Sequence, residues 1–335
     1  MNTEQKKQRD QIRAAMFGHA IGDALGVPVE FRSRESLRND PVTGYRGYGS
    51  YLVPAGTWSD DTSMAMATMD SLTHGLDYED MMGRFCDWKN HAAYTATDMV
   101  FDIGITTRQA LSRSGHGTPA LECGSDGEHE NGNGSLMRII PAVLYCKYQK
   151  PELSEAEQLQ IIHRVSCLTH RHPRAQMGCG IYAFVLLALL EQPDKEAIQT
   201  GLSRAKAYYA GQPAFRAEMD TYHRLLDQSA AAFAREPEDS IKSSGYVVAT
   251  LEAAVWCLMN TDTYADCVLK AVNLGSDTDT VAAVSGGLAG CLYGMEQIPA
   301  DWYKGLIRKE QMEALCEAFA ERFAGEDSYP ADTSD

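Results

Sequence analysis

The chain has 335 residues, with 30 lysines and arginines against 46 aspartates and glutamates, which gives a formal net charge of −16. This excess of negative charge argues against a nucleic-acid backbone or an anionic membrane surface as the main partner. The length allows a large buried core, and we expect one domain because the informative residues extend from Glu30 to Thr280 and must converge to act.

Helical periodicity dominates the sequence, while alternating β-branched runs are almost absent. We therefore predict an all-α fold, a compact single-domain bundle of many helices over residues 1–325, followed by a polar tail at 326–335. The predicted helices are 5–17, 63–72, 78–91, 154–168, 174–190, 195–209, 215–234, 245–258, 263–274 and 310–323. Two glycine-rich loops, 39–56 and 112–134, interrupt them, and long loops in a compact domain are commonly functional.

The nine cysteines are an odd number, include no Cys-x-x-Cys pair and lie mostly within helix-like runs. This pattern indicates reduced thiols and a cytoplasmic protein. The N-terminal segment has no signal-peptide apolar core, because His19 and Asp23 interrupt its first apolar run. The longest uncharged run, 175–190, is shorter than the roughly 20 residues that a membrane span needs. We expect a buried central helix there and no membrane segment.

The first segment with chemical interest, 22–31, follows the first predicted helix. Pro28 ends regular structure and leaves Glu30 among apolar neighbours, where a carboxylate is paired, associated with a metal, or raised in pKa. The adjacent Arg32 and Arg34 allow the alternative that Glu30 is an ordinary surface residue. The local sequence leaves both interpretations open.

The next segment, 56–62, is a glycine turn followed by a hydroxyl and two carboxylates, Ser59, Asp60 and Asp61, at the start of a predicted helix. Adjacent aspartates repel each other unless a cation lies between them. The segment therefore indicates either a metal site or simple helix capping, because Ser, Thr and Asp are also the residues that cap helix N-termini.

Four features in the middle of the chain each have an ordinary and a functional interpretation. Asp102 is placed to cap a helix, and the glycine-rich run 131–138 is either a plain turn or an anion cradle to which Arg138 adds charge. His170 precedes a proline at a helix end, where histidine usually interacts with the last carbonyls. Tyr246 begins a helix, where it either packs or stacks on a base.

The segment 273–280 near the end of the chain repeats the earlier turn and organises the rest of the sequence. Gly275 can end one helix, and Asp277, Asp279 and Thr280 then present three hard oxygen ligands at the start of the next. Such ligands suit Mg²⁺ or Mn²⁺, with helix capping again the alternative. Four carboxylates from the two turns would offset the charge of two divalent ions, and small residues after Thr280 allow close helix packing.

Taken in this order, the segments between about Ile12 and Gly290 resemble the ADP-ribosylglycohydrolase family, which includes hydrolases of ADP-ribosylated dinitrogenase reductase, arginine and serine. The resemblance implies a compact all-α fold with two Mg²⁺ or Mn²⁺ ions at the base of an ADP-ribose cleft. It implies that the metal ligands are Ser59, Asp60, Asp61, Asp277, Asp279 and Thr280. It places Glu30 beside the metals, Asp102 near the ribose, Asn133, Gly134 and Ser135 at the diphosphate, and His170 and Tyr246 along the rest of the ligand. The family usually has threonine where this chain has Ser59, and the hydroxyl is kept.

The resemblance implies hydrolysis of the glycosidic bond of ADP-ribose on a protein side chain, with arginine favoured, or on a small molecule. Such cleavage passes through an oxocarbenium-like state and needs an activated water and a proton donor. We expect Glu30 and Asp61 to handle the water and Asp102 to assist opening of the sugar or departure of the leaving group. Serine-linked, nucleic-acid-linked and O-acyl substrates stay open.

Two alternatives belong to other functional classes. The run 277–281 superficially matches the Asp-x-Asp-x-Thr/Val motif of metal-dependent phosphohydrolases, but that motif should follow a buried strand, and 271–275 looks like a helix end. The other alternative is a relative that binds ADP-ribose without turning it over.

Overall fold

The computed structural model describes residues 2–324, and the polar tail predicted at 326–335 lies outside them. The described residues contain sixteen α-helices and no strand, which confirms the predicted all-α class. The α-helices are α1 (Thr3–Gly26), α2 (Arg34–Asn39), α3 (Asp60–His74), α4 (Tyr78–His91), α5 (Ile105–Gly115), α6 (Ile140–Tyr148), α7 (Glu155–Cys167), α8 (Pro173–Glu191), α9 (Lys195–Ala210), α10 (His223–Leu226), α11 (Ala230–Phe233), α12 (Val247–Met259), α13 (Tyr264–Asn273), α14 (Thr278–Tyr293), α15 (Ala300–Gly305) and α16 (Lys309–Ala324). Short 3₁₀ turns are η1 (Val27–Val29), η2 (Ala120–Glu122), η3 (Leu136–Arg138), η4 (Pro213–Tyr222), η5 (Glu238–Ser240) and η6 (Met295–Gln297).

The structure adds α2, α5, α6 and α15, which were not predicted, and two of the predicted helices differ in extent. The first helix continues to Gly26 instead of ending at Phe17, because the later part of α1 is buried on all sides and its polar residues lie inside the protein. The single helix predicted over 215–234 is broken into η4, α10 and α11. Ser229 accepts a hydrogen bond from the Ala232 amide and so caps a new turn, which prevents one continuous helix.

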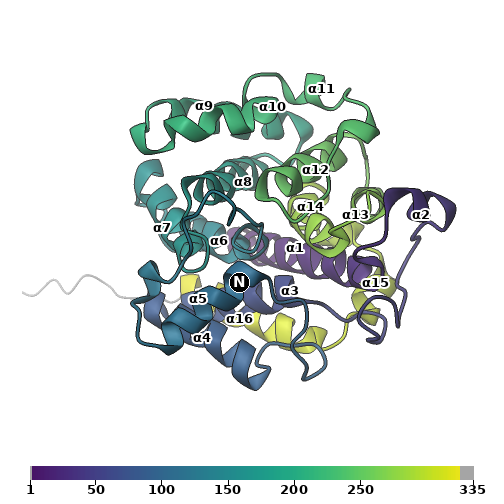
Figure 1. The fold of residues 1–335 in the computed structure, drawn as a ribbon, viewed down its shortest axis with the longest axis horizontal. Coiled ribbons are helices and arrows are strands. Elements are labelled where there is room, and N and C mark those ends of the chain that lie inside the picture. The colour runs from purple at the N-terminus through teal and green to yellow at the C-terminus, as the bar shows by residue number, and fades with distance from the viewer. Residues whose placement is uncertain (1, 325–335) are drawn as a thin grey trace, which may run out of the picture.

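The centre of the fold is the close packing of α1 against α14 (Figure 1). Gly18, Gly22 and Gly26 recur every four residues along one face of α1, and a Cβ atom at Gly22 would lie 2.1 Å from the Ala282 carbonyl oxygen. At Gly26 the nearest atoms belong to Asp279 in the first turn of α14. The predicted close packing after Thr280 is therefore present, and it brings the end of α1 to the start of α14.

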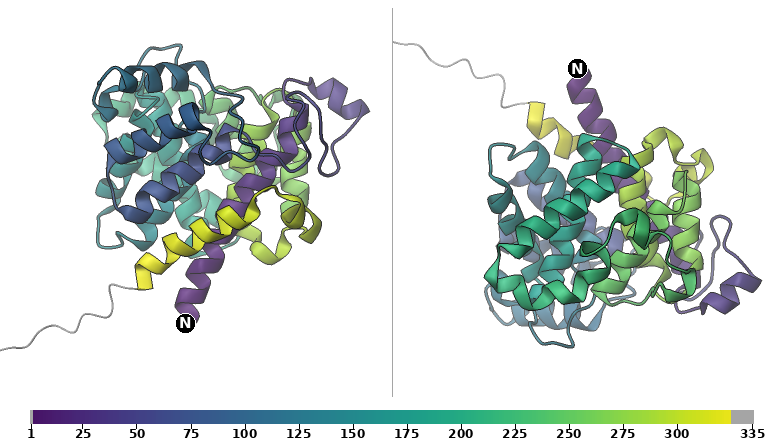
Figure 2. Two further views of the ribbon diagram at one scale, coloured as in Figure 1. Left: turned by 90° about the horizontal axis from the view of Figure 1, so that it is seen from below. Right: turned by 90° about the horizontal axis from the view of Figure 1, so that it is seen from above.

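The remaining helices surround this pair. α12 and α13 pack on α14, α16 and α3 pack on α1, and α4 packs on α3. α9, α10 and α11 form an outer layer at the top of Figure 1, over α8 and α12. The first turns of α1 and the whole of α2 project from the body, as both views of Figure 2 show.

The predicted buried central helix corresponds to α8. By length and composition it is the one described helix apolar enough to cross a membrane, but 83% of its apolar window is buried inside the protein. It packs against α7, α9 and α14. The nine cysteines, all within the described residues, form no disulfide.

Candidate active site

The first acidic turn begins α3. Ser59 is its N-cap residue: the Ser59 hydroxyl accepts a hydrogen bond from the Asp61 amide (3.3 Å) and lies 2.9 Å from Asp61 Oδ2, to which it donates. Asp60 and Asp61 are both buried in the first helical turn. Capping therefore explains Ser59 in part, but it does not explain two buried carboxylates.

The second acidic turn begins α14. Asp277 occupies the N-cap position without making a side-chain capping bond, so capping does not account for it. Its Oδ2 atom instead accepts a hydrogen bond of 2.6 Å from the Asn133 side chain, which also donates to the Thr250 hydroxyl at 2.9 Å. Asp279 is fully buried, and its Oδ1 atom accepts the amide of Thr280 at 2.9 Å.

The two turns converge although more than two hundred residues separate them. Thr280 donates from its hydroxyl to Asp61 Oδ2 at 3.2 Å, which joins the first turn of α14 to that of α3. Carboxylate oxygens of Asp23, Asp61 and Asp279 lie within 4.8 Å of one another, and those of Glu30, Asp102 and Asp279 form a second such group. Asp279 belongs to both groups and lies at the centre of the cluster.

The cluster has the properties of a cation site. Asp61 Oδ1 and Asp279 Oδ2 are buried oxygen atoms with no hydrogen-bond partner among the described residues. Burial, reinforced by the neighbouring carboxylates, raises the pKa values of Asp60, Asp61 and Asp279 well above the ordinary range. Unpartnered carboxylate oxygens are costly in the interior unless a cation neutralises them. Hard oxygen donors of this kind fit Mg²⁺ or Mn²⁺.

Asp23 is a member of the cluster to which sequence analysis gave no role. Its carboxylate accepts the Ser59 amide (3.0 Å), the Thr62 amide (3.1 Å) and the Thr62 hydroxyl (2.6 Å), so it ties α1 to the first turn of α3. Burial raises the pKa of Asp23 to about 7. Asp23 could have been found from the sequence, because it lies in a helical run of mostly small and apolar residues, where a carboxylate is buried and requires partners.

Glu30 is buried and not an ordinary surface residue. Its Oε2 atom accepts a hydrogen bond of 2.6 Å from the Tyr51 hydroxyl, and burial together with the charge of Asp102 raises the pKa of Glu30 to about 9. Arg34, one of the two arginines that suggested a surface position, instead donates to the backbone carbonyl of Leu274. Tyr51 lies in the glycine-rich loop 39–56 and was not among the predicted site residues.

A cleft with a volume of about 270 Å³ opens above the cluster. Of the predicted site residues, its lining includes Glu30, Asp60, Asp102, Asn133, Gly134, His170, Asp277 and Thr280. Ser59, Asp61 and Asp279 are buried and do not line the cleft, which places them beneath its floor. Asp102 has a left-handed backbone (φ 55°) and immediately precedes the lining segment that leads into α5.

The glycine-rich run 131–138 supplies one wall of the cleft, but two of its side chains face the interior. The Ser135 hydroxyl accepts a hydrogen bond from Ser166 at 2.8 Å and lies 3.5 Å from the sulfur of Cys179. Arg138 is fully buried and does not line the cleft, so its guanidinium makes no direct contact with a ligand there. Its side chain donates to the Val165 carbonyl and the Thr169 hydroxyl, and burial lowers its pKa to about 10.

His170 and Tyr246 lie on the same side of the cleft. His170 is buried, its Nδ1 atom lies 2.8 Å from the Thr169 hydroxyl, and burial lowers its pKa to about 3, so the ring is neutral. The backbone of Tyr246 pairs with that of Gly132. Its ring is 37% exposed, lies 6.0 Å from the guanidinium of Arg174, and does not line the cleft itself.

Comparison with known proteins gives consistent matches along the whole chain. The model of the ADP-ribosylglycohydrolase family matches residues 4–329. The chain is 34% identical over 312 residues to the ADP-ribosylarginine hydrolase Tri1 of Serratia proteamaculans (strain 568), covering 92% of this chain and 78% of that protein. It is 29% identical over 308 residues to the ADP-ribosyl-dinitrogen reductase glycohydrolase of Rhodospirillum rubrum, covering 91% and 92%. A solved structure of an ADP-ribosylglycohydrolase-related protein complex is similar with a TM-score of 0.77 and 30% identity, covering 94% of this chain and 99% of that one.

Proposed function

The chain belongs to the ADP-ribosylglycohydrolase family, and from this premise we propose that it is a metal-dependent hydrolase that releases ADP-ribose from arginine side chains. The observation that carries the metal dependence is the pair of unpartnered buried oxygens, Asp61 Oδ1 and Asp279 Oδ2, beneath the cleft. Arginine is favoured because relatives at 34% and 33% identity are named ADP-ribosylarginine hydrolases.

The residues that would hold two Mg²⁺ or Mn²⁺ ions are those of the two acidic turns, Ser59, Asp60, Asp61, Asp277, Asp279 and Thr280. When bound, such ions stabilise negative charge on sugar oxygens and lower the pKa of water. Asn133 orients one carboxylate of this set, because its side-chain NH₂ group donates to Asp277 Oδ2 at 2.6 Å. Partners of this kind orient ligands and tune their affinity for the ion.

Hydrolysis breaks the bond between the ribose anomeric carbon and the guanidino nitrogen, and the oxygen of water takes the place of that nitrogen. Bound cations would lower the pKa of Glu30 from its metal-free value of about 9 and so ionise the carboxylate. Tyr51 holds its Oε2 atom, and the ionised Glu30 would accept a proton from the water through Oε1. Asp102, whose carboxylate belongs to the same group of oxygens as that of Glu30, is placed to assist opening of the sugar or departure of the guanidine. The negative charge of the cluster also favours the oxocarbenium-like transition state.

The glycine-rich wall and His170 complete the pocket for the rest of the ligand. Gly134 lacks a side chain where a Cβ atom would lie only 2.8 Å from the His170 ring, so the backbone and the ring approach each other closely. The backbone N–H of Asn133 is not available to the ligand, because it donates to the Gly245 carbonyl at 3.0 Å. Diphosphate binding therefore falls to the backbone around Gly134 and not to the Ser135 hydroxyl, which faces the interior.

The phosphohydrolase alternative lacks its structural context. Its motif should follow a buried strand, whereas the residues before Asp277 form the end of α13 and a turn with Gly275 at φ 77°. A non-catalytic ADP-ribose binder is the remaining alternative, and turnover distinguishes it from the hydrolase.

The test is incubation with arginine- and serine-ADP-ribosylated peptides, with EDTA and after addition of Mg²⁺ or Mn²⁺, followed by measurement of free ADP-ribose. We expect release from the arginine-linked peptide, loss of release in EDTA, and recovery with metal. The double variant Asp60→Asn, Asp61→Asn should neither bind metal nor release ADP-ribose. Persistent hydrolysis in that variant would refute the assignment, and binding without product would support the non-catalytic alternative.

A further inference from the structure

We propose that the surface beside the cleft docks an acidic segment of the protein that carries the ADP-ribosyl group. The surface has a basic groove, defined by Arg32, Arg34, Arg38 and Lys242, and an apolar rim, defined by Phe31, Tyr48, Leu52 and Ile105. This inference rests on the proposed function and adds to it the class of substrate, a macromolecule with acidic residues near the modified side chain.

A thin wall separates the basic groove from the cleft. The groove has a volume of about 620 Å³, and its lining shares Phe31 and Ser276 with the lining of the cleft. The Phe31 amide donates to the Ser276 carbonyl at 2.7 Å, and the Ser276 amide donates to the Arg32 carbonyl at 2.8 Å. The turn that carries Asp277 is therefore bordered by the cleft on one side and the groove on the other. A polypeptide whose modified side chain enters the cleft can extend directly into the groove.

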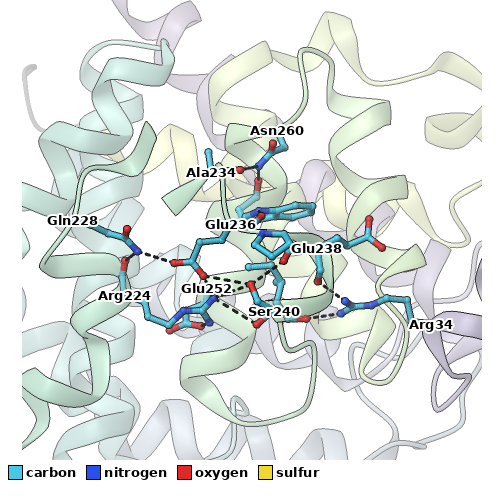
Figure 3. A network of polar contacts seen from close by, with 12 residues as sticks. Arg34, Arg224, Gln228, Ala234, Glu236, Glu238, Ser240, Glu252 and Asn260 are labelled. Atoms are coloured by element: carbon cyan, nitrogen blue, oxygen red, sulfur yellow. Dashed lines mark hydrogen bonds and ion pairs between the residues drawn. The ribbon is translucent and has the colours of Figure 1, made fainter. Parts of the chain in front are cut away.

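Two cations of the groove have no carboxylate bonded to them. The Arg34 guanidinium donates to the backbone carbonyls of Leu274, Glu238 and Ile241, and Figure 3 shows it reaching Glu238. Lys242 is exposed and forms no ion pair within the part of the chain that the structure describes. Lys242 therefore remains available to a carboxylate of a partner, and Arg34 adds a positive charge to the groove that no bonded carboxylate offsets.

The other two cations are already paired. Arg38 contacts Glu238 at 2.8 Å and Asp239 at 2.6 Å, and Arg32 contacts Asp40 at 2.9 Å. The groove nevertheless has more cations than anions in its lining, in a chain whose net charge is −16. Charge complementarity of this kind favours a partner with carboxylates at the groove and raises the rate of encounter.

The apolar rim gathers most of the large hydrophobic side chains that the described residues expose. Seven such side chains are exposed, and four of them belong to the rim, with Leu52 at 76%, Ile105 at 75% and Phe31 at 71%. Single exposed hydrophobic residues are ordinary, but a group of them beside a ligand cleft is typical of a protein-binding surface. Phe31 and Ile105 also line the cleft, so the rim is continuous with it.

The rim is rigidly joined to the proposed catalytic carboxylate. The Ser50 amide donates to the Pro28 carbonyl at 3.0 Å, and the Ser50 hydroxyl donates to the Glu30 carbonyl at 2.6 Å. These bonds anchor the turn that presents Tyr48 and Leu52. A partner that packs on the rim is thus held in a fixed position relative to Glu30.

A macromolecular protein substrate explains both parts of the surface together. The four cations of the groove do not line the cleft, and of the rim residues only Phe31 and Ile105 do. A nucleic acid would find cations in the groove, but it would also meet an apolar rim and a strongly acidic protein. An acidic polypeptide fits all three features.

The test compares four arginine-linked substrates at equal concentration: ADP-ribosylarginine itself, and peptides of one length with acidic, neutral or lysine residues flanking the modified arginine. We expect kcat/KM to be highest for the acidic peptide, by about tenfold over the lysine peptide at low salt, and the difference to shrink with added salt. The binding of fluorescent forms of the same peptides provides a second measurement that does not require turnover.

Two variants test the two parts of the surface. Lys242→Glu should lower kcat/KM for the acidic peptide about tenfold and leave ADP-ribosylarginine within about twofold, because the substitution places like charges together. Lys7→Glu is the matched control, since it makes the same charge change at an exposed lysine near the N-terminal end of α1. Leu52→Asn suits the left-handed backbone at φ 56° and should lower kcat/KM for a folded ADP-ribosylated protein more than for ADP-ribosylarginine.

The outcomes separate this inference from the proposed function. If ADP-ribosylarginine is cleaved but the flanking charges and Lys242→Glu have no effect, the docking surface is refuted and the enzymatic function stands. If nothing is cleaved, the proposed function fails, and the peptide-binding measurement alone decides whether the groove prefers acidic flanks. A preference for an ADP-ribosylated oligonucleotide that Lys242→Glu abolishes would assign the groove to nucleic acid and overturn the inference.

Discussion

Replacement of Asp279 by asparagine should stabilise the metal-free protein while it abolishes metal binding and turnover. Asp279 is fully buried, its Oδ2 atom has no partner, and its carboxylate lies within 4.8 Å of carboxylate oxygens from Asp23 and Asp61. Asparagine keeps the oxygen that accepts the Thr280 amide. It also places an NH₂ group where the unpartnered oxygen was. The carboxylates of Asp23 and Asp61 then face a hydrogen-bond donor in place of a third negative charge.

The magnitude follows from the charges. Two unit charges 4.8 Å apart repel by about 3.5 kcal/mol at an effective dielectric constant of 20. A carboxyl escapes this repulsion by keeping a proton, which costs about 4 kcal/mol at pH 7 for a group whose ordinary pKa is 3.8. We therefore expect the substitution to raise the free energy of unfolding in EDTA by about 2–4 kcal/mol. At roughly 2 °C per kcal/mol, Tm rises by about 4–8 °C.

The pH dependence has a defined sign. Because the folded-state pKa of Asp279 is raised above its unfolded value, the folded state binds more protons than the unfolded state, and the wild type loses stability as the pH rises above about 4. The advantage of Asp279→Asn in EDTA should therefore grow from pH 4 to pH 7.

Thermal unfolding with and without Mn²⁺, together with ADP-ribose release, measures the effect. Metal at about 100 times its Kd should stabilise the wild type by about 2.7 kcal/mol and the variant hardly at all. Asp10→Asn, an exposed carboxylate on α1, is the matched control and should change neither. A variant that is less stable than the wild type in EDTA, or one that keeps the metal-induced shift, would contradict the electrostatic reasoning.

Three further predictions concern other parts of the molecule. Tyr51→Phe removes the 2.6 Å hydrogen bond to Glu30, so kcat should fall about tenfold with KM nearly unchanged, as steady-state kinetics will show; an unchanged kcat would exclude a positioning role. Burial lowers the pKa of His163 to about 3, so the folded state binds fewer protons at this residue than the unfolded state does. The free energy of unfolding therefore decreases as the pH falls below about 6.5. His163→Gln should reduce the slope of unfolding free energy against pH by up to about 1.4 kcal/mol per pH unit, as measured by denaturant titrations. Gly22→Ala would place a Cβ atom 2.1 Å from the Ala282 carbonyl oxygen and should cost about 1–3 kcal/mol or more of unfolding free energy, whereas a neutral effect would show that α1 and α14 can separate freely.

The helical class and the two acidic turns could be predicted from sequence because both depend on local patterns. Helical periodicity and the near absence of alternating runs indicate an all-α fold, and paired aspartates beside a hydroxyl indicate a cation site wherever they occur. The convergence of the turns at Thr280 and Asp61 was inferred from their similarity, and the 3.2 Å contact between these residues bears out the idea.

Other features depend on the tertiary arrangement. Asp23 lies in an apolar helical run, and only the packing of α1 on α3 shows that its carboxylate accepts hydrogen bonds from Ser59 and Thr62. Tyr51 lies in a loop whose path no periodicity predicts. The full burial of Arg138 likewise depends on tertiary packing, because its partners are the Val165 carbonyl and the Thr169 hydroxyl, which belong to a distant part of the sequence.

The close contact of α1 with α14 also determines when the protein can complete its folding during synthesis. The glycines of α1 are synthesised long before α14, because Gly26 and Thr278 are 252 residues apart in the sequence. A ribosome must therefore translate these 252 residues before α1 meets the helix on which it packs and before the second acidic turn exists. A nascent chain arrested ahead of Asp277 contains Asp60 and Asp61, two of the four aspartates proposed to bind the ions, and a helix with an uncovered face. Such a chain is a substrate for chaperones and proteases instead of a partly active enzyme.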